Sequence, residues 1–177
     1  ADLVNIVSES ERGAKADALT HARQTATGTE PYATREEIEE GALVFRGTNY
    51  DNLCTTKDFV NFELVADWKI EPYSDSGIYL RGTPQVQIWD PFTQPTKAGS
   101  EVGSGGLYNN LTNASKPLVV ADKPIGEWNH LRIIMAGDIV HVFLNGELVV
   151  NATPLENYWQ RDLPVFPFGP IELQAHK

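Results

Sequence analysis

The amino-acid sequence predicts an all-β fold, an antiparallel β-sandwich or jelly roll, on two main observations. From Gly41 onward, short runs of Val, Ile, Leu, Phe, Tyr and Trp are separated by Gly, Pro, Asn and Asp, which is the pattern of serial strands. No long apolar repeat with helical spacing occurs in this part of the chain. The number of runs is close to what a sandwich or jelly roll requires.

The clearest strand is Asn61–Ile70, where apolar residues occupy alternate positions from Phe62 to Ile70. This period of two is typical of a strand with one buried face. Asn145-Gly146 marks a tight hairpin, because these two residues readily adopt positive φ angles. The predicted strands are Gly41–Arg46, Phe62–Ile70, Gly77–Arg81, Val86–Trp89, Leu131–Met135, Ile139–Leu144, Glu147–Val150 and Ile171–His176, the fifth to seventh forming a meander.

Residues 1–40 differ in composition, being rich in Ala, Thr, Glu and Arg and poor in aromatic residues. Ser8–Gln24 is expected to form a helix. A second short helix is expected over Thr34–Glu40, because Thr34 and Glu37 have the spacing of a capping box. The sequence therefore predicts an N-terminal, possibly helical extension over residues 1–40, followed by one β domain over residues 41–177.

Composition restricts the class of function. The net charge of −10 comes from scattered acidic residues, which disfavours a nucleic-acid partner. No apolar run is long enough for a membrane span, and the first residues lack the features of a signal peptide. Cys54 is the single cysteine, so an intrachain disulfide is excluded. The sequence predicts a soluble globular domain of unknown oligomeric state.

Three predicted strands each carry a polar face opposite their apolar face. Such a face suits a sugar, because planar amide, carboxylate and guanidinium groups match hydroxyls, and aromatic rings stack on the apolar side of a pyranose. A merely solvated sheet face is the alternative, but clustered Gln, Trp, Tyr, Arg and His favour a binding surface. The residues concerned are Asp75, Gly77, Tyr79 and Arg81, then Gln85, Gln87 and Trp89, then Glu172, Gln174 and His176.

Six motifs occur in a fixed order along the chain. They are DSGIYLRG at 75–82, PQVQIWD at 84–90, GGLY at 105–108, GEWN at 126–129, LNG at 144–146 and GPIELQAH at 169–176. Together they resemble the 3-keto-disaccharide hydrolase family, whose fold is a concanavalin-like jelly roll. The resemblance runs from about Gly41 to the end of the chain, and it implies a carbohydrate-active domain and a secreted or periplasmic location. The side chain of Trp128, within GEWN, is expected to be buried in the hydrophobic core.

The resemblance implies a reaction on glycosides whose C3 hydroxyl has been oxidised to a ketone, which makes the C2 proton acidic. A base removes that proton, the C1 substituent is eliminated, and water adds. His176 is the candidate base, because imidazole titrates near neutrality, with Glu172 or Gln174 orienting it. Asp75 is the alternative base or the leaving-group acid. Arg81 would stabilise the enolate, with Gln87 as a neutral donor, and Tyr79, Gln85, Trp89, Asp90 and Tyr108 would hold the sugar.

Two other classes of function stay open, namely a non-catalytic carbohydrate-binding module and an interaction domain without a sugar ligand. The ionisable set Asp75, Arg81, Glu172 and His176 favours the enzyme, since a pure binder needs no base. Asp75 and Arg81 could also be a structural ion pair. No organic cofactor is implied. A divalent metal stays open, although no ligand spacing identifies an ion. The expected partner is an oligosaccharide or glycoside.

Overall fold

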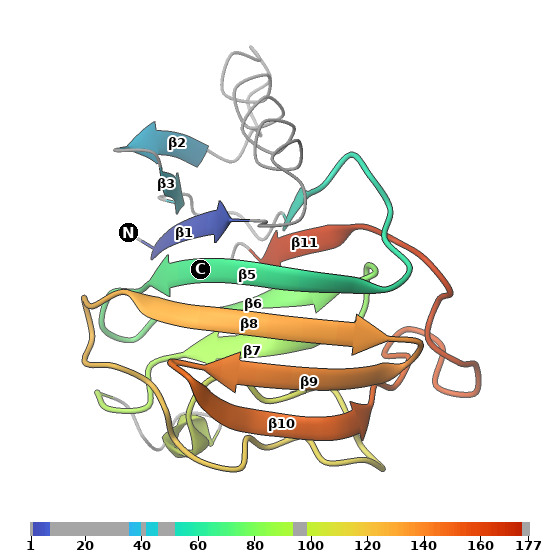
Figure 1. Ribbon diagram of the computed structural model, residues 1–177. Coiled ribbons are helices and arrows are strands. Elements are labelled where there is room, and N and C mark those ends of the chain that lie inside the picture. The colour runs from blue at the N-terminus through green and yellow to red at the C-terminus, as the bar shows by residue number, and fades with distance from the viewer. Residues whose placement is uncertain (1, 8–35, 40–41, 46–51, 94–98, 175–177) are drawn as a thin grey trace.

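The computed structural model describes residues 2–7, 36–39, 42–45, 52–93 and 99–174 (Figure 1). These residues form eleven strands in two sheets, with a short 3-10 helix at Ser100–Val102. Every pair of neighbouring strands is antiparallel. The predicted antiparallel sandwich is confirmed. Within the described ranges, no helix is both long enough and apolar enough to cross a membrane.

The larger sheet has seven strands in the order β10-β9-β8-β5-β1-β3-β2. Their bounds are β1 Asp2–Val7, β2 Glu36–Glu39, β3 Ala42–Phe45, β5 Phe62–Lys69, β8 Asn129–Ala136, β9 Ile139–Leu144 and β10 Glu147–Pro154. The smaller sheet has four strands in the order β4-β11-β6-β7. Their bounds are β4 Asn52–Cys54, β6 Asp75–Leu80, β7 Gln85–Trp89 and β11 Ile171–Gln174.

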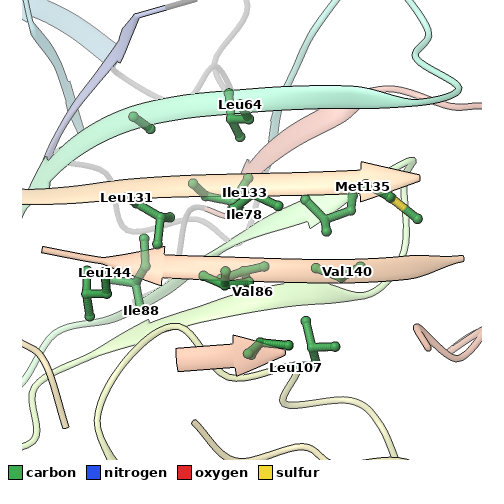
Figure 2. Packing of buried hydrophobic residues seen from close by; sticks show 14 of the residues in the cluster. Leu64, Ile78, Val86, Ile88, Leu107, Leu131, Ile133, Met135, Val140 and Leu144 are labelled. Atoms are coloured by element: carbon green, nitrogen blue, oxygen red, sulfur yellow. The ribbon is translucent and has the colours of Figure 1, made fainter. Parts of the chain in front are cut away.

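The hydrophobic core lies between the two sheets (Figure 2). Alternate residues of each strand enter it, because successive side chains of a strand point to opposite faces. The larger sheet contributes Leu64, Ala66, Trp68, Leu131, Ile133, Met135, Val140, Val142 and Leu144, and the smaller sheet contributes Ile78, Leu80, Val86, Ile88 and Ile171. The polar positions of β6, β7 and β11 are thereby turned away from the larger sheet.

The meander β8-β9-β10 is built as its turn residues predict. Asn145 and Gly146 have φ angles of 53° and 89°, the positive pair that a type I′ hairpin requires. The Asn145 side chain accepts a hydrogen bond from His130 N at 2.8 Å and donates one to Ala121 O at 2.7 Å. The turn is therefore fixed by side-chain bonds as well as by backbone conformation.

Two local expectations are wrong. Glu36–Glu39, within the helix expected over Thr34–Glu40, forms strand β2 and pairs with β3 from Glu36↔Phe45 to Glu39↔Ala42. A helix of so few residues is weak on its own, so pairing with a neighbouring strand prevails over the capping signal. Trp128 is partly exposed rather than in the core, with Lys69 Nζ 5.2 Å from its ring centroid.

The N-terminal region is described only in part. The helix expected over Ser8–Gln24 lies outside the described residues, which in this region are 2–7 and 36–39. Strand β1 pairs with β3 and β5, and β2 pairs with β3. Residues on both sides of position 40 thus belong to one sheet, while the proposed domain boundary stays a prediction.

We predict that Ile133→Ala destabilises the domain far more than Ile134→Ala, its neighbour on β8. Ile133 is 0% exposed in the core, so truncation should lower the free energy of unfolding by about 2–5 kcal/mol. Ile134 points to the other face and is only partly buried, so its truncation should lose less than half as much. Urea unfolding of both variants tests this, and equal losses would contradict the assigned faces.

Candidate active site

Strand pairing in the smaller sheet brings the predicted site residues together. Glu172 of β11 pairs with Tyr79 of β6, and Tyr79 pairs with Gln85 of β7. The next rows pair Gly77 with Gln87 and Asp75 with Trp89. Paired residues project to the same side of a sheet, and this side lies opposite the core. We call it the polar face; its side chains are Asn52, Cys54, Asp75, Tyr79, Gln85, Gln87, Trp89, Glu172 and Gln174.

A chain of hydrogen bonds crosses the polar face from β6 to β7. Gln87 Nε2 donates to Asp75 Oδ1 at 2.6 Å, and Gln85 Nε2 donates to Gln87 Oε1. Gln85 and Gln87 are only 5% and 2% exposed. Gln85 Oε1, at the end of the chain, is buried and has no hydrogen-bond partner among the described residues. The network orients the Asp75 carboxylate and leaves the buried Gln85 oxygen as an acceptor without a partner among the described residues.

A second set of contacts joins β4, β11 and β6. Asn52 Nδ2 donates to Glu172 Oε2 at 3.0 Å, and Gln174 Nε2 donates to Tyr79 Oη at 3.4 Å. The pKa of Tyr79 is raised, first by burial and then by the nearby Glu172, Tyr158 and Asp75. Its hydroxyl therefore stays protonated at neutral pH. Since Gln174 uses an acceptor position of this oxygen, the Tyr79 hydrogen can be donated to a ligand.

Gly77 makes room for the Gln85 side chain. A Cβ atom at this position would lie 2.8 Å from Gln85 Oε1 and 2.9 Å from its Cδ. Both distances are shorter than real Cβ contacts allow. The small residue at the middle of β6 therefore lets the amide of Gln85 lie across the sheet toward Gln87.

The segment that carries the GGLY motif packs along β7, next to Trp89. Gly105 N donates to Gln87 O at 2.8 Å, and Gln87 N donates to Gly106 O at 2.9 Å, so this segment covers the free edge of β7. Trp89 Nε1 donates to Gly103 O at 2.7 Å. Its buried ring meets the edge of the exposed Tyr108 ring, with 5.5 Å between centroids. Tyr108 is thus an accessible aromatic residue in contact with Trp89.

Arg81 does not join the polar face. Strand β6 ends at Leu80, and Arg81 has a φ of 55°, which breaks the alternation that the sequence suggested. The buried guanidinium donates to Pro167 O at 3.1 Å and to Gly137 O. Burial lowers the pKa of Arg81, while Asp138 opposes that shift. Through these two hydrogen bonds, Arg81 connects the loop before β11 with the β8–β9 turn of the larger sheet.

Asp90 stabilises a turn at the end of β7. Its carboxylate accepts hydrogen bonds from the backbone N–H groups of Tyr73, Phe92 and Thr93. Burial alone would raise the pKa of Asp90, but the hydrogen bonds from Thr93, Tyr73 and Phe92 outweigh it and hold the pKa below its ordinary value. The sugar-binding role expected for Asp90 gains no support from this placement.

His176, the base expected from the sequence, lies outside the described residues, which end at residue 174. Glu172 and Gln174, expected to orient it, both lie on the polar face. Within the part of the chain that the structure describes, no three His, Cys, Asp or Glu residues are grouped so as to hold a metal ion.

Sequence reasoning missed an aromatic loop that borders the polar face. This aromatic loop, residues 157–161, contains Tyr158, Trp159 and Arg161. Trp159 Nε1 donates to Gly82 O at 3.1 Å, in the turn between β6 and β7. The sequence feature that could have indicated this loop is the pair of adjacent aromatic residues in an otherwise polar segment. That segment lies before the last strand and outside every predicted strand.

We predict that Gly77→Ala displaces the Gln85 side chain, because the new methyl group would collide with its amide. Urea unfolding should show a stability loss of about 1–3 kcal/mol, as for other overpacked sites. The matched control is the double variant Gly77→Ala/Gln85→Ala, in which the collision with the amide is absent and only the 3.2 Å contact with the Cβ atom of residue 85 is left. Strict additivity of the two single losses would contradict the assigned contact.

We also predict that protonation of Asp90 lowers the free energy of unfolding when the protein is acidified. Because its folded-state pKa is lowered, its stabilisation is fully present above the ordinary aspartate pKa of about 4, and is lost as pH falls through the lower folded-state value. Asp90→Asn should therefore lose less stability than the unsubstituted protein when acidified from neutral pH. Denaturant titrations across that range test this, with the exposed Asp58→Asn as control. Parallel acid profiles for Asp90→Asn and the unsubstituted protein would argue against it.

Comparison with solved structures supports the fold. Two crystal structures of candidate glycosyl hydrolases from Parabacteroides distasonis are similar to this chain. One has a TM-score of 0.57 at 25% identity, over 73% of this chain and 77% of that chain. The other has a TM-score of 0.64 at 21% identity, over 80% of this chain and 78% of that chain.

Sequence comparison supports the family. A 3-keto-disaccharide hydrolase from Bacteroides thetaiotaomicron is 26% identical over 147 residues, which cover 64% of this chain and 49% of the relative. The chain thus spans about half the length of that relative. The model of the 3-keto-alpha-glucoside-1,2-lyase-like domain matches residues 13–177, a match that begins within the N-terminal region. Since this is most of the 177 residues, the chain belongs to the 3-keto-alpha-glucoside-1,2-lyase-like domain family.

Proposed function

We propose that this domain cleaves the glycosidic bond of 3-keto-glycosides or 3-keto-disaccharides by elimination and hydration. The observation that carries the proposal is the polar face, where Asp75, Tyr79 and Glu172 converge with oriented amides. Membership of the 3-keto-alpha-glucoside-1,2-lyase-like family supports the chemical class. We also propose a secreted or periplasmic location, because the resemblance to the 3-keto-disaccharide hydrolases implies one.

The first step is removal of the C2 proton, which the C3 ketone makes acidic. We assign the base to His176, as the family motif suggests, with Asp75 as the alternative. Asp75 is supported by the 2.6 Å hydrogen bond from Gln87, which fixes one carboxylate oxygen. The electron pair of the C2–H bond moves into the C2–C3 bond, and the C3 oxygen becomes an enolate.

The enolate oxygen needs a donor, and we assign Tyr79 in place of Arg81. Tyr79 lies in the middle of the polar face and keeps its proton because burial and nearby negative charge raise its pKa. Arg81 is bound to backbone carbonyls elsewhere. A donor placed where charge develops lowers the barrier more than one that binds the ground state equally.

The second step breaks the bond between C1 and the leaving oxygen. Electrons return from the enolate, the C3 ketone re-forms with a C1–C2 double bond, and the leaving oxygen takes up the proton that the base removed from C2, delivered through Asp75 or Glu172. Water then adds at C1, the base removes a proton from that water and delivers it to C2, and the 3-keto sugar is restored with a free C1 hydroxyl. No oxidant or reductant is consumed in this sequence.

A carbohydrate-binding module is the second candidate. It is favoured by the exposed aromatic rings of Tyr108 and Trp159 beside the polar face, on which the apolar side of a pyranose could stack. A binder would not distinguish a keto sugar from its parent by reactivity. The two candidates therefore differ in one measurable outcome.

We predict cleavage of a 3-keto-glycoside and no cleavage of the matched unoxidised glycoside, because only the ketone acidifies the C2 proton. His176→Ala and Tyr79→Phe should each lower kcat by about a hundredfold, with much smaller effects on binding. Product release is followed by chromatography, and binding by calorimetry. Binding of both sugars without cleavage of either would identify a binding module, and cleavage of the parent glycoside would contradict the mechanism.

A further inference from the structure

The aromatic loop presents a large ring to solvent in a fixed orientation. Trp159 is 61% exposed, yet its indole Nε1 donates to Gly82 O at 3.1 Å and its backbone N donates to Asn157 Oδ1 at 3.1 Å. An exposed side chain usually keeps its rotamer freedom. Here the indole is held by a hydrogen bond while most of the residue stays accessible.

Tyr158 supports the same surface. Its ring meets that of Trp159 edge to face, with centroids 4.8 Å apart and an interplanar angle of 76°. The guanidinium carbon of Arg161 lies 5.0 Å from the Tyr158 centroid, and Arg161 Nη1 donates to Asn109 O at 2.8 Å. Tyr158 N also donates to Thr83 Oγ1 at 3.3 Å. The two rings are thus ordered before any ligand arrives, which reduces the entropy lost on binding.

The loop adjoins the polar face through the turn between β6 and β7. Gly82, whose carbonyl holds Trp159, lies so close to Glu172 that a Cβ atom there would be 3.2 Å from Glu172 Oε1. Asn109, whose carbonyl holds Arg161, accepts a hydrogen bond from Gln85 N through Oδ1 at 3.3 Å. The aromatic rings therefore border the row Glu172, Tyr79 and Gln85, at the end of the polar face away from Trp89.

We propose that Trp159, supported by Tyr158, is a stacking platform for a second sugar ring, the one that leaves when the glycosidic bond breaks. The inference rests on the proposed function, since it places the leaving group at the edge of the polar face. A pyranose presents an apolar face of C–H groups to an aromatic ring. The hydroxyls around its edge would then meet the Glu172 carboxylate and the Arg161 guanidinium, which are suitable polar partners.

The test compares a 3-keto-disaccharide, which has a second ring, with a methyl 3-keto-glucoside, which has none. Trp159→Ala should lower kcat/KM for the disaccharide about tenfold, or ~1.4 kcal/mol, and change kcat/KM for the methyl glycoside less than about twofold. Trp159→Phe should recover most of the loss, because it restores an aromatic face. The matched control is Trp128→Ala, a partly exposed tryptophan beside Lys69 of the larger sheet, which should affect neither substrate.

A binding measurement separates failure of this inference from failure of the proposed reaction. Titration with the unoxidised parent disaccharide should change the tryptophan fluorescence of the unsubstituted protein and of Trp128→Ala, but not that of Trp159→Ala. This response would support the platform even if no substrate were cleaved. Equal losses of kcat/KM on both substrates, or an unchanged fluorescence response in Trp159→Ala, would overturn it. A fluorescence response to a protein partner but to no sugar would also overturn it.

Discussion

The register between β11 and β6 is the constraint on which the candidate site depends. Ile171 pairs with Leu80 and Glu172 pairs with Tyr79, although about ninety residues of chain separate the two strands. A slip of one residue would turn Glu172 toward the core and Leu173 toward the polar face. Burial of Ile171 against the larger sheet opposes that slip. The packing of the core therefore positions the carboxylate beside the tyrosine.

The polar face is unusual because much of it is withdrawn from water. Gln85 and Gln87 are as buried as many core residues, and burial of an amide is unfavourable unless it is hydrogen-bonded. Their bonds to each other and to Asp75 meet most of this requirement. The buried amide oxygens of Gln85 and Gln174 are left without a partner among the described residues. A surface needed only for solubility would not require such a network.

The larger sheet carries polar side-chain pairs on its outer face. On the larger sheet, Asp67 accepts a 2.7 Å contact from His130, and Glu63 pairs with Arg132 at 2.6 Å. These side chains are substantially exposed, and pairs of this kind add little to stability or specificity. The polar face differs because Gln85 and Gln87 are buried, its groups are interlinked by hydrogen bonds, and ordered aromatic rings border it. Burial and connection, rather than charge alone, distinguish the candidate site.

The sequence by itself determined the two-sheet fold class, the meander β8-β9-β10 and the polar face of β6, β7 and β11. These follow from alternation and turn chemistry, which act between neighbouring residues. Only the tertiary structure decided that Glu36–Glu39 is a strand, since its partner β3 competes with the local helix signal.

The tertiary structure also decided that Arg81 leaves the polar face and that Trp159 borders it. Arg81 turns away because its φ is positive, and its two Nη atoms donate to carbonyls on distant loops. Trp159 is held by the carbonyl of Gly82, far away in the sequence. Alternation fixes the side of a strand to which a residue points, but where a strand ends and which loop meets it depend on contacts between distant segments.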